Sequence, residues 1–453
     1  MTKVKNIFIP LILLFCLPIC SEQQDTRRLC AAKTSNPIVE CSAVEKKLEQ
    51  LNIDFDVCCQ NLQGSCSTVN QQIQELTLSA TCDQSICINQ SLIDTATPQI
   101  QQSGVYYLTE NVDTSTHALV IDADNVVLDL NGFVMSGGLS AIQATSHTNI
   151  QIVNGKIDAT TSTGMLLTSC TTVQIADISF STISGQSAQL NSVNGFNLKD
   201  CSVVNSSSGG SSLGHYEFTL CNNGVISGCS VADSSSGRGF LFTDCSNVYC
   251  SQLQVLRMRN PAEGYSVGGD SSNVNFDHCF FNENSSTRNM TGFNISCVGS
   301  LVNDCYALEN DSARNSRAFM SSSSAVNVIF DSCYAIGNTK PSGGSQTLRG
   351  FQILGNYIFV RNCLAMRNLS VSPGSGVGYQ VSASNSCFFN NKAALNTTYG
   401  FDNSGTNNVF LGNVAYSNPI NYNGTIGPNQ TFDLSDGILT GTPVVWNNIN
   451  SQP

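Results

Sequence analysis

Apolar and polar positions repeat along most of this chain with a period of 23 to 30 residues. Each repeat has one key position that follows a turn-forming residue and is most often cysteine. The key positions are Gly132, Gly155, Ile178, Cys201, Cys229, Leu253, Cys279, Cys305, Cys333, Cys363, Cys387 and Asn413. Self-similarity at this period is typical of solenoids, in which one repeat cannot bury its apolar face alone. The pattern therefore predicts stacked coils in place of separate globular domains.

Apolar residues flank each key position in a regular way. One stands two residues after it, as at Val203 and Ala335, and another three residues before it, as at Leu198 and Phe276. Spacings of two and three cannot both continue one strand, so one residue must turn the chain between two strands. The residue just before the key position is usually Asn, Asp or Gly, which tolerate left-handed backbone angles. Each repeat thus contains two short strands joined by a tight turn.

A second turn and a third strand complete the repeat. The second turn is predicted five residues after the key position, at Asn284, Asn310, Asn338, Asn368 and Asn418. The third strand is predicted to begin at small-aromatic pairs such as those after Arg238 and Arg349. Strands of successive coils lie about 4.8 Å apart, so like residues stack on like. We expect an all-β, right-handed parallel β-helix of about twelve coils over residues 95–420, with ladders of Cys, Asn and aromatic residues.

Two segments carry a family resemblance. Gly104–Val112 (GVYYLTENV) and Val126–Gly137 (VVLDLNGFVMSG) resemble the opening coils of right-handed parallel β-helix proteins of the pectin-lyase-like superfamily. This superfamily includes carbohydrate-binding and sugar-hydrolysing modules, and its members range from pectate lyases, polygalacturonases and epimerases to tailspikes and adhesins. The resemblance implies the fold specifically. It leaves the activity open.

The two ends of the chain are expected to differ from the coils. Lys3 and Lys5 precede an apolar run with the layout of a secretory signal peptide over residues 1–21, too short to span a bilayer. We therefore expect a secreted or cell-surface protein with no transmembrane span in the mature chain. A lipid anchor at Cys20 is the alternative for attachment. Residues 421–453 are interpreted as a C-terminal tail or cap.

The Cys-rich segment 22–90 contains a helical pattern. Apolar residues recur at steps of three and four from Cys41 to Leu62, which makes a heptad seam over 41–62. One interpretation is an N-terminal helix that caps the open end of the coils. The other is a short coiled-coil stem that makes a homo-oligomer through Cys41–Leu62. The disulfide pattern of Cys30–Cys87 cannot be deduced from the spacing.

The cysteines of the coils indicate packing and not chemistry. Of the chain's 21 cysteines, twelve lie between Cys170 and Cys387, mostly at inward positions of successive strands. Parallel neighbours would stand about 4.8 Å apart at Cβ, beyond the roughly 3.5–4.5 Å of a disulfide. They also lack the close pairs that hold a metal. We interpret them as small buried hydrophobic residues with inert thiols, and we expect no metal and no cofactor.

The net charge and the missing catalytic motifs argue against two classes of function, nucleic-acid binding and sugar cleavage of the polygalacturonase type. The net charge of −12 argues against a nucleic-acid partner, which needs a basic surface. Sugar-cleaving β-helices need clustered carboxylates, and the Asn-Thr-Asp, Asp-Asp, Gly-His-Gly and Arg-Ile-Lys patterns of polygalacturonases do not occur. The one neighbouring acid–base pair is Asp277-His278, the catalytic candidate. His278 also occupies the turn position, which would explain it without catalysis.

Arginines form the second candidate site. Most of them fall between residues 238 and 367, near one edge of the predicted stack, and the candidate ligand-binding residues are Arg238, Arg257, Arg259, Arg288, Arg317 and Arg349. One interpretation is salt bridging to acidic residues of adjacent loops. The other is a groove that binds acidic sugars or sulfates through bidentate contacts.

The sequence therefore favours a secreted or surface-attached, non-catalytic β-helix scaffold that binds glycans or a host or partner surface. An acidic polysaccharide is the expected ligand class. The first alternative is a divergent polysaccharide lyase or hydrolase that acts on acidic glycans. The second is a tailspike-like structural oligomer. The sequence does not decide whether the protein is an enzyme.

Overall fold

The computed structural model describes residues 85–424, except 96–97, 116–117, 342–346 and 372–375, together with the strands at 431–433 and 448–451. All of these belong to one of two compact units, Ser65–Pro453. The predicted signal peptide, Cys20 and the heptad over 41–62 lie outside the described residues.

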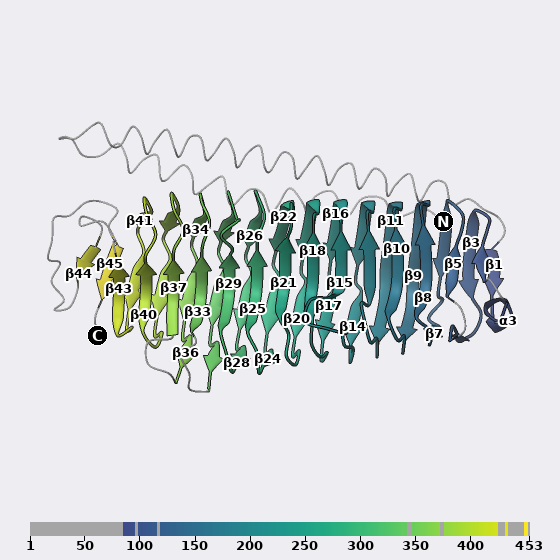
Figure 1. Cartoon of the computed structure of the whole chain (residues 1–453), viewed down its shortest axis with the longest axis horizontal. Helices are drawn as coiled ribbons and strands as arrows, with labels where there is room; N and C mark the ends of the chain where they lie inside the picture. The colour runs from purple at the N-terminus through teal and green to yellow at the C-terminus, as the bar shows by residue number, and fades with distance from the viewer. Residues whose placement is uncertain are drawn as a thin grey trace, which may run out of the picture. The chain divides into compact units, whose positions relative to one another are not determined.

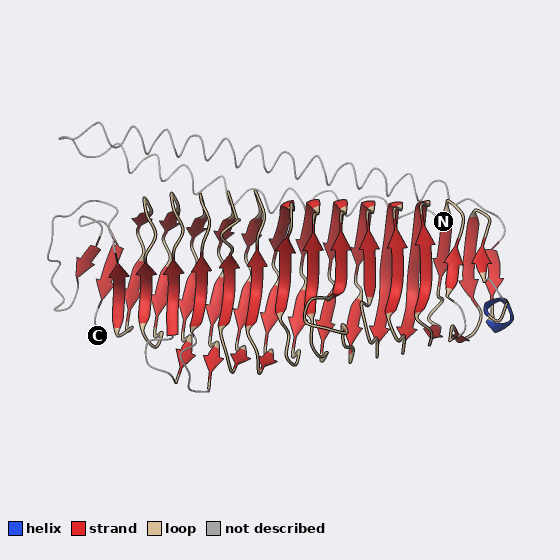
Figure 2. Cartoon of the chain, viewed as in Figure 1, coloured by secondary structure: helices blue, strands red, loops and turns tan. Residues whose placement is uncertain are grey.

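The described residues form a parallel β-helix, as the sequence predicted. Every paired strand is parallel to its neighbours, and the strands of one sheet follow one another in chain order (Figure 1). That sheet has fourteen strands, one for each coil. The expected number of about twelve was too low because two coils, which contribute β2 (Gln99–Ile100) and β5 (Leu119–Ile121) to this sheet, precede the coil of the first key position, Gly132. The one helix among the described residues is α3 (Gln90–Ile93), beside strands that Figure 2 shows in red.

The 14-stranded sheet takes one strand from each coil. Its members are β2 (Gln99–Ile100), β5 (Leu119–Ile121), β8 (Ser140–Thr145), β10 (Thr163–Thr168), β12 (Ala188–Asn191), β15 (Gly214–Thr219), β18 (Arg238–Thr243), β21 (Glu263–Gly268), β25 (Met290–Ile295), β29 (Ser316–Ser321), β33 (Leu348–Ile353), β37 (Gly376–Val381), β40 (Tyr399–Asn403) and β43 (Ile420–Gly424).

The remaining strands form a 27-stranded sheet and a small 4-stranded one. The larger comprises β1 (Ser85–Ile88), β3 (Gly104–Leu108), β4 (Val112–Asp113), β6 (Val126–Asp129), β7 (Val134–Ser136), β9 (Thr148–Asp158), β11 (Thr171–Ser181), β13 (Asn194–Lys199), β14 (Ser202–Val204), β16 (Asn222–Ser227), β17 (Ser230–Ala232), β19 (Ser246–Ser251), β20 (Gln254–Leu256), β22 (Ser272–Asp277), β23 (Phe280–Asn282), β26 (Leu301–Asn303), β27 (Tyr306–Leu308), β30 (Ile329–Asp331), β31 (Tyr334–Ile336), β34 (Phe359–Arg361), β35 (Leu364–Met366), β38 (Cys387–Phe389), β39 (Lys392–Ala394), β41 (Val409–Leu411), β42 (Val414–Tyr416), β44 (Thr431–Asp433) and β45 (Asn448–Ser451). The smaller comprises β24 (Ser285–Ser286), β28 (Asp311–Ser312), β32 (Thr339–Lys340) and β36 (Leu369–Ser370).

A single residue in the left-handed region turns each coil within the 27-stranded sheet. Asn131, Asp200, His278 and Asn362 have φ values between 51° and 56° at this turn, as the sequence predicted. The residue after the turn points inward, and the key-position cysteines from Cys201 to Cys363 are buried. Their thiols are free in the structure. The apolar residue three positions before the key position and the one two positions after it therefore both point into the same core.

One coil departs from the expected register. Cys387 pairs with Phe359 and is only partly buried, so it does not occupy the key position of its coil. Asn391 takes that place, because its Oδ1 accepts a hydrogen bond from the backbone N–H of Cys363 at 3.0 Å. The turn residue is accordingly Asn390, with φ of 51°. The register with Asn391 at the key position is favoured because it buries Phe388 completely, whereas the expected register would turn that ring outward.

Aromatic residues of the 14-stranded sheet form one continuous inward ladder. Adjacent rings are nearly parallel, with centroids 4.4 Å to 5.5 Å apart, through Tyr216, Phe240, Tyr265, Phe293, Phe319, Phe351, Tyr379, Phe401 and Tyr422. Tyr265 and Tyr379 are fully buried in it and offer no surface to a ligand. In-register stacking of this kind adds to the area that each ring buries.

Asparagines form a second buried ladder at the next turn. Asn338 Oδ1 accepts from both the backbone N–H and the Nδ2 of Asn310, at 3.2 Å and 2.9 Å. Its own Nδ2 donates to Ala307 O and to Asn368 Oδ1, each at 3.0 Å. The ladder continues through Asn396, which the expected register of that coil did not place there. Each Asn side chain thus accepts the backbone N–H of the equivalent Asn in the preceding coil, a buried donor at the turn.

Replacing Asn338 with Ala should destabilise the coils strongly. The change leaves the buried backbone N–H of Asn310 without its hydrogen-bond partner, at about 1–3 kcal/mol, and removes the side-chain hydrogen bonds to Asn310 and Asn368 as well. Urea denaturation of the two proteins measures the difference. The matched control is Asn289→Ala at an exposed position, which should stay within about 0.5 kcal/mol of the natural protein. Equal losses for both variants would contradict a structural role for the ladder.

A row of small residues precedes the aromatic ladder, and His215 interrupts it. The equivalent residues in later coils include Gly239, Gly264 and Ala318. At Gly239 an added Cβ would approach Val255 Cγ2 to 2.5 Å, so the row has little room. His215 is fully buried, and neither ring nitrogen has a hydrogen-bond partner among the described residues. Burial lowers the pKa of His215 to about 4, since the core disfavours the charged form.

Stability should therefore fall as the pH drops from about 6.5 to about 4. In this window the unfolded chain binds a proton at His215 and the folded chain does not, so protons favour unfolding, with a total effect of about 3 kcal/mol. Urea midpoints across this range measure the loss. His215→Asn removes the titrating group, so its profile should be flatter in the same window. An unchanged pH dependence in this variant would refute the assignment.

Candidate functional site

The outer face of the 14-stranded sheet carries a row of charged and amide side chains. Because side chains alternate along a strand, residues directly after the buried aromatic ladder point outward. Strand pairing aligns two rows of polar residues along the stack. One row directly follows the aromatic ladder, and the other lies two residues before it. The polar stripe consists of Glu217, Arg238, Glu263, Thr291, Asn294, Arg317, Arg349, Gln352, Gln380 and Asp402. Three of the six predicted arginines, Arg238, Arg317 and Arg349, belong to it.

Arg238 and Glu263 form a shielded ion pair at one end of the stripe. Arg238 Nε donates to Glu263 Oε2 at 2.6 Å, and the two side chains are 23% and 15% exposed. Asn294 Nδ2 donates to the other carboxylate oxygen, Oε1, at 2.7 Å. Arg238 Nη1 also donates to the carbonyl of Ser212, in the loop before β15. Both oxygens of Glu263 are therefore engaged within the stripe.

Glu217 lies at the same end and is 8% exposed. Its carboxylate accepts the backbone N–H of Gly214 at 3.2 Å. The Nε2 amides of Gln186 and Gln189 also donate to it, each at 3.4 Å. Backbone and amide donors thus contact both oxygens of this carboxylate, and no arginine forms an ion pair with it among the described residues.

Arg317 and Arg349 stand directly opposite each other on β29 and β33. Arg317 Nε donates to the neutral Gln352 Oε1, whose Nε2 donates to Gln380 Oε1 at 3.3 Å. The Nε of Arg349 is buried and has no hydrogen-bond partner among the described residues. Burial lowers the pKa of Arg349 to about 10, and the positive charge of Arg317 contributes. Burial also lowers the pKa of Arg317. Both guanidinium groups still carry their charge at neutral pH.

The other predicted arginines lie outside the polar stripe. Arg257 is at a turn with φ of 48° and binds Asp233 through two contacts, Nε–Oδ1 at 2.9 Å and Nη2–Oδ2 at 2.8 Å. This partner raises the pKa of Arg257 and lowers that of Asp233. Arg259 and Arg288 are exposed residues of the turns before β21 and β25. The six arginines thus divide into a sheet group and a turn group.

Asp277 and His278 come together, but on the 27-stranded sheet. His278 Nδ1 lies 3.0 Å from Asp277 Oδ2, and its Nε2 lies 3.1 Å from Asp304 Oδ2. Asp277 also accepts from Tyr249 Oη at 3.1 Å and from Asn303 Nδ2 at 2.7 Å. The imidazole therefore bridges carboxylates of two coils, and three side chains, those of His278, Tyr249 and Asn303, contact the Asp277 carboxylate. These contacts link two adjacent coils at a turn of the 27-stranded sheet, and a catalytic role for Asp277 and His278 stays a prediction.

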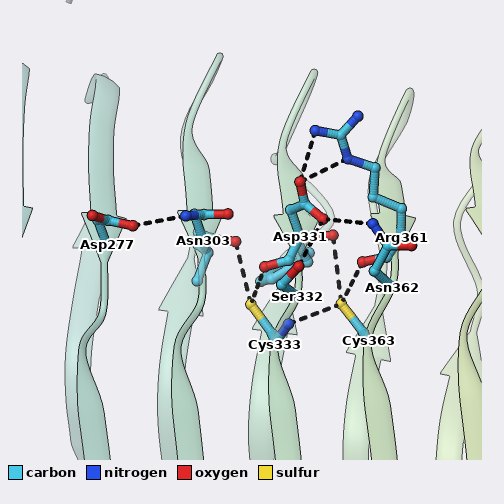
Figure 3. Close-up of polar contacts among 10 residues, drawn as sticks. Asp277, Asn303, Asp331, Ser332, Cys333, Arg361, Asn362 and Cys363 are labelled. Carbon is cyan, nitrogen blue, oxygen red and sulfur yellow. Dashed lines mark hydrogen bonds and ion pairs between the residues drawn. The ribbon is translucent and has the colours of Figure 1, made fainter. Parts of the chain in front are cut away.

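The same outward row continues as a ladder of polar contacts. Figure 3 shows Asp277 beside Asn303 and, two coils from Asp277, Asp331 beside Arg361. Arg361 Nη2 lies 2.7 Å from Asp331 Oδ2, and Asn362 Nδ2 donates to Asp331 Oδ1 at 3.1 Å. The buried thiols of Cys333 and Cys363 lie on the inner side of these turns. Opposite charges in adjacent coils stabilise the stack on this face.

Sequence reasoning missed the carboxylate and amide members of the stripe. Glu263 directly precedes Gly264-Tyr265, just as Arg238 precedes Gly239-Phe240, so the same motif could have identified it. Glu217, Gln352 and Asp402 each follow an aromatic residue of the inward ladder by one position. That offset is a usable signal, but only once the aromatic row is known to be a single stacked ladder.

No group of three or more His, Cys, Asp or Glu side chains within the described ranges is arranged to hold a metal ion. In the same part of the chain, no helix has the length and apolar character needed to cross a membrane.

Comparison with known proteins finds similarity in the fold alone. No family model matches the chain, and no curated protein matches it. Among solved structures, the receptor-binding tailspike of bacteriophage Det7 is 12% identical, with a TM-score of 0.34. The match covers 74% of this chain and 78% of the tailspike chain. The Streptococcus pneumoniae surface adhesin PfbA is 11% identical, with a TM-score of 0.31 and coverage of 78% and 90%. The periplasmic alginate epimerase AlgG is 9% identical, with a TM-score of 0.32 and coverage of 82% for each chain.

Proposed function

We propose that this protein is a secreted or surface-attached β-helix scaffold that binds glycan chains along the polar stripe and does not cleave them. The observation that carries the proposal is the stripe itself. Hydrogen-bonding side chains repeat there at intervals of one coil, about 4.8 Å, on the outer face of one continuous sheet. A chain of hydroxylated rings lying along the stack would meet amide, carboxylate and guanidinium groups in succession.

The state of the carboxylates supports binding over cleavage. Glycoside hydrolysis needs one carboxyl group that donates a proton and a second that acts as base or nucleophile. Glu263 is committed to Arg238 and Asn294, and Glu217 to two amides and a backbone N–H. Asp277 and His278 are bound to each other on a different sheet. Each of these carboxylates is thus occupied by neighbouring side chains or backbone of the same chain, and no two of them face each other across an open site in the described part of the chain.

The predicted signal peptide over 1–21 supports secretion, with a lipid anchor at Cys20 as the alternative attachment. Homo-oligomerisation through Cys41–Leu62, as in a tailspike-like assembly, stays a prediction for residues outside the described part of the chain. Neither is required for the stripe to bind a glycan, because the stripe lies within a single chain.

A double substitution in the stripe tests the proposal. Asn294→Ala with Gln380→Ala should weaken binding of oligosaccharides, because each lost neutral hydrogen bond contributes about 0.5–1.5 kcal/mol. Isothermal titration against a panel of neutral and acidic oligosaccharides gives the affinities. The matched control is Gln254→Ala, an exposed amide on the 27-stranded sheet, which should bind as the natural protein does.

Two outcomes would contradict the proposal. Binding that is equal in the double variant and the control would remove the polar stripe as the site. Release of reducing sugar or unsaturated uronate from the same panel would establish the alternative, a polysaccharide lyase or hydrolase. Loss of that release on changing Asp277 or His278 would then identify the catalytic residues.

A further inference from the structure

Arg317 and Arg349 are placed where stacking makes like charges costly. They are directly opposed in neighbouring strands, on a face where side chains one coil apart are in contact range. The stripe avoids this cost at its other end, where Arg238 is opposite Glu263 in the next strand. A repulsive pair in a stripe that elsewhere matches opposite charges indicates a missing partner of negative charge.

The contacts of the two side chains agree with this. A guanidinium offers five N–H donors. In the described part of the chain, Arg317 donates to Gln352 through Nε, and neither Arg317 nor Arg349 has an ion pair. The Nε of Arg349 is buried and makes no hydrogen bond to the described residues. Two guanidinium groups at directly paired positions therefore have most of their N–H donors without a hydrogen-bond partner among the described residues.

The nearby carboxylates do not neutralise the pair. Glu263 attracts Arg317 at longer range, but its oxygens bind Arg238 and Asn294. Asp402 attracts Arg349 at longer range and accepts Asn423 Nδ2 at 2.8 Å. The pair is thus a local positive site on a chain whose net charge is −12. Salt screens the distant negative charges beyond about 8 Å, whereas a directly bound anion is screened much less.

The positive site is short. Along the row, Thr291 and Val377 occupy the positions on either side of the pair, and both side chains are almost fully buried. Two coils span only about 10 Å, so the pair fits one anionic group and not a run of them. A planar or tetrahedral oxyanion between two guanidinium groups can accept paired N–H donors from both.

We propose that Arg317 and Arg349 together bind a single oxyanion of an acidic glycan, either the carboxylate of a uronic acid or a sulfate ester. This inference rests on the proposed glycan-binding function of the polar stripe and adds the class of sugar that it selects. The amides on the same face, Gln352 and Gln380, would then bind the uncharged part of the ligand.

The experiment uses three probes on the full secreted chain: a uronic-acid tetrasaccharide, its methyl ester, and a sulfated neutral tetrasaccharide. The methyl ester keeps the shape of the first probe and removes its charge. We expect the uronate and the sulfated sugar to bind better than the ester by about 10-fold or more, because hydrogen bonds to charged groups are stronger than neutral ones. The two charged probes separate carboxylate from sulfate as the natural group.

Arg317→Gln and Arg349→Gln should each lower affinity for the preferred charged probe by about 10- to 100-fold. Both should leave affinity for the methyl ester within about three-fold. Arg349→Lys keeps the charge without the fork and should recover only part of the loss. Arg367→Gln is the matched control, since it removes an exposed arginine at a turn of the 27-stranded sheet and should change nothing.

Folding is checked separately, because loss of a guanidinium could act through stability. Removing one of two like charges should keep or raise the melting temperature, so a large decrease would count against the proposed repulsive pair. Equal binding of the uronate and its ester, with no effect of either Gln variant, would overturn this inference while leaving the glycan-binding stripe intact. Absence of binding by all three probes would overturn both proposals.

Discussion

Parallel pairing in register is the constraint on which this structure depends. Each strand bonds to the equivalent strand of the next coil, so nearly every side chain meets its own counterpart about 4.8 Å away. Residues that gain from contact with their own kind are therefore favoured. Tyr and Phe stack as parallel rings, Asn links coil to coil at the buried turn, and cysteine fills narrow inward positions. The low content of charged residues, 11%, is a consequence of the same rule.

The rule also explains how charge is arranged where it does occur. On the 27-stranded sheet, His278 lies between two carboxylates of adjacent coils, and Arg361 is beside Asp331. On the 14-stranded sheet, Arg238 is beside Glu263. The pairs Arg238–Glu263 and Arg361–Asp331 place opposite charges in adjacent coils, where like charges would repel. The opposed pair Arg317–Arg349 breaks this arrangement, and the proposed anion site rests on that exception.

Stacking likewise limits what the aromatic residues can do. On the outer side of the 27-stranded sheet, Phe280, Tyr306 and Tyr334 stack with centroids 5.0 Å and 4.8 Å apart and nearly parallel planes. Each ring covers the face of the next, so a sugar ring would meet edges and not a free face. Burial raises the pKa of Tyr306 to about 12, with the Asp304 carboxylate contributing, which keeps its phenol neutral. These rings stabilise the stack, and for that reason the proposed glycan-binding function is assigned to polar groups.

The sequence by itself determined the solenoid, the turn residues and most inward positions, because each of these depends on a local pattern that recurs in every coil. It also grouped Arg238, Arg317 and Arg349, because each directly precedes a small residue followed by an aromatic one.

The register of the coil at Cys387 was decided only in three dimensions, by the burial of Phe388 and the hydrogen bond from the backbone N–H of Cys363 to Asn391 Oδ1. The same is true of the division of the arginines between sheet and turns, and of the partnership of Arg238 with Glu263. Which residues face each other across coils depends on loops of unequal length between the strands, from the short turn at His278 to the insertion before Gly214. A repeat pattern specifies the position of a residue within its own coil, whereas its partner is specified by the neighbouring coil.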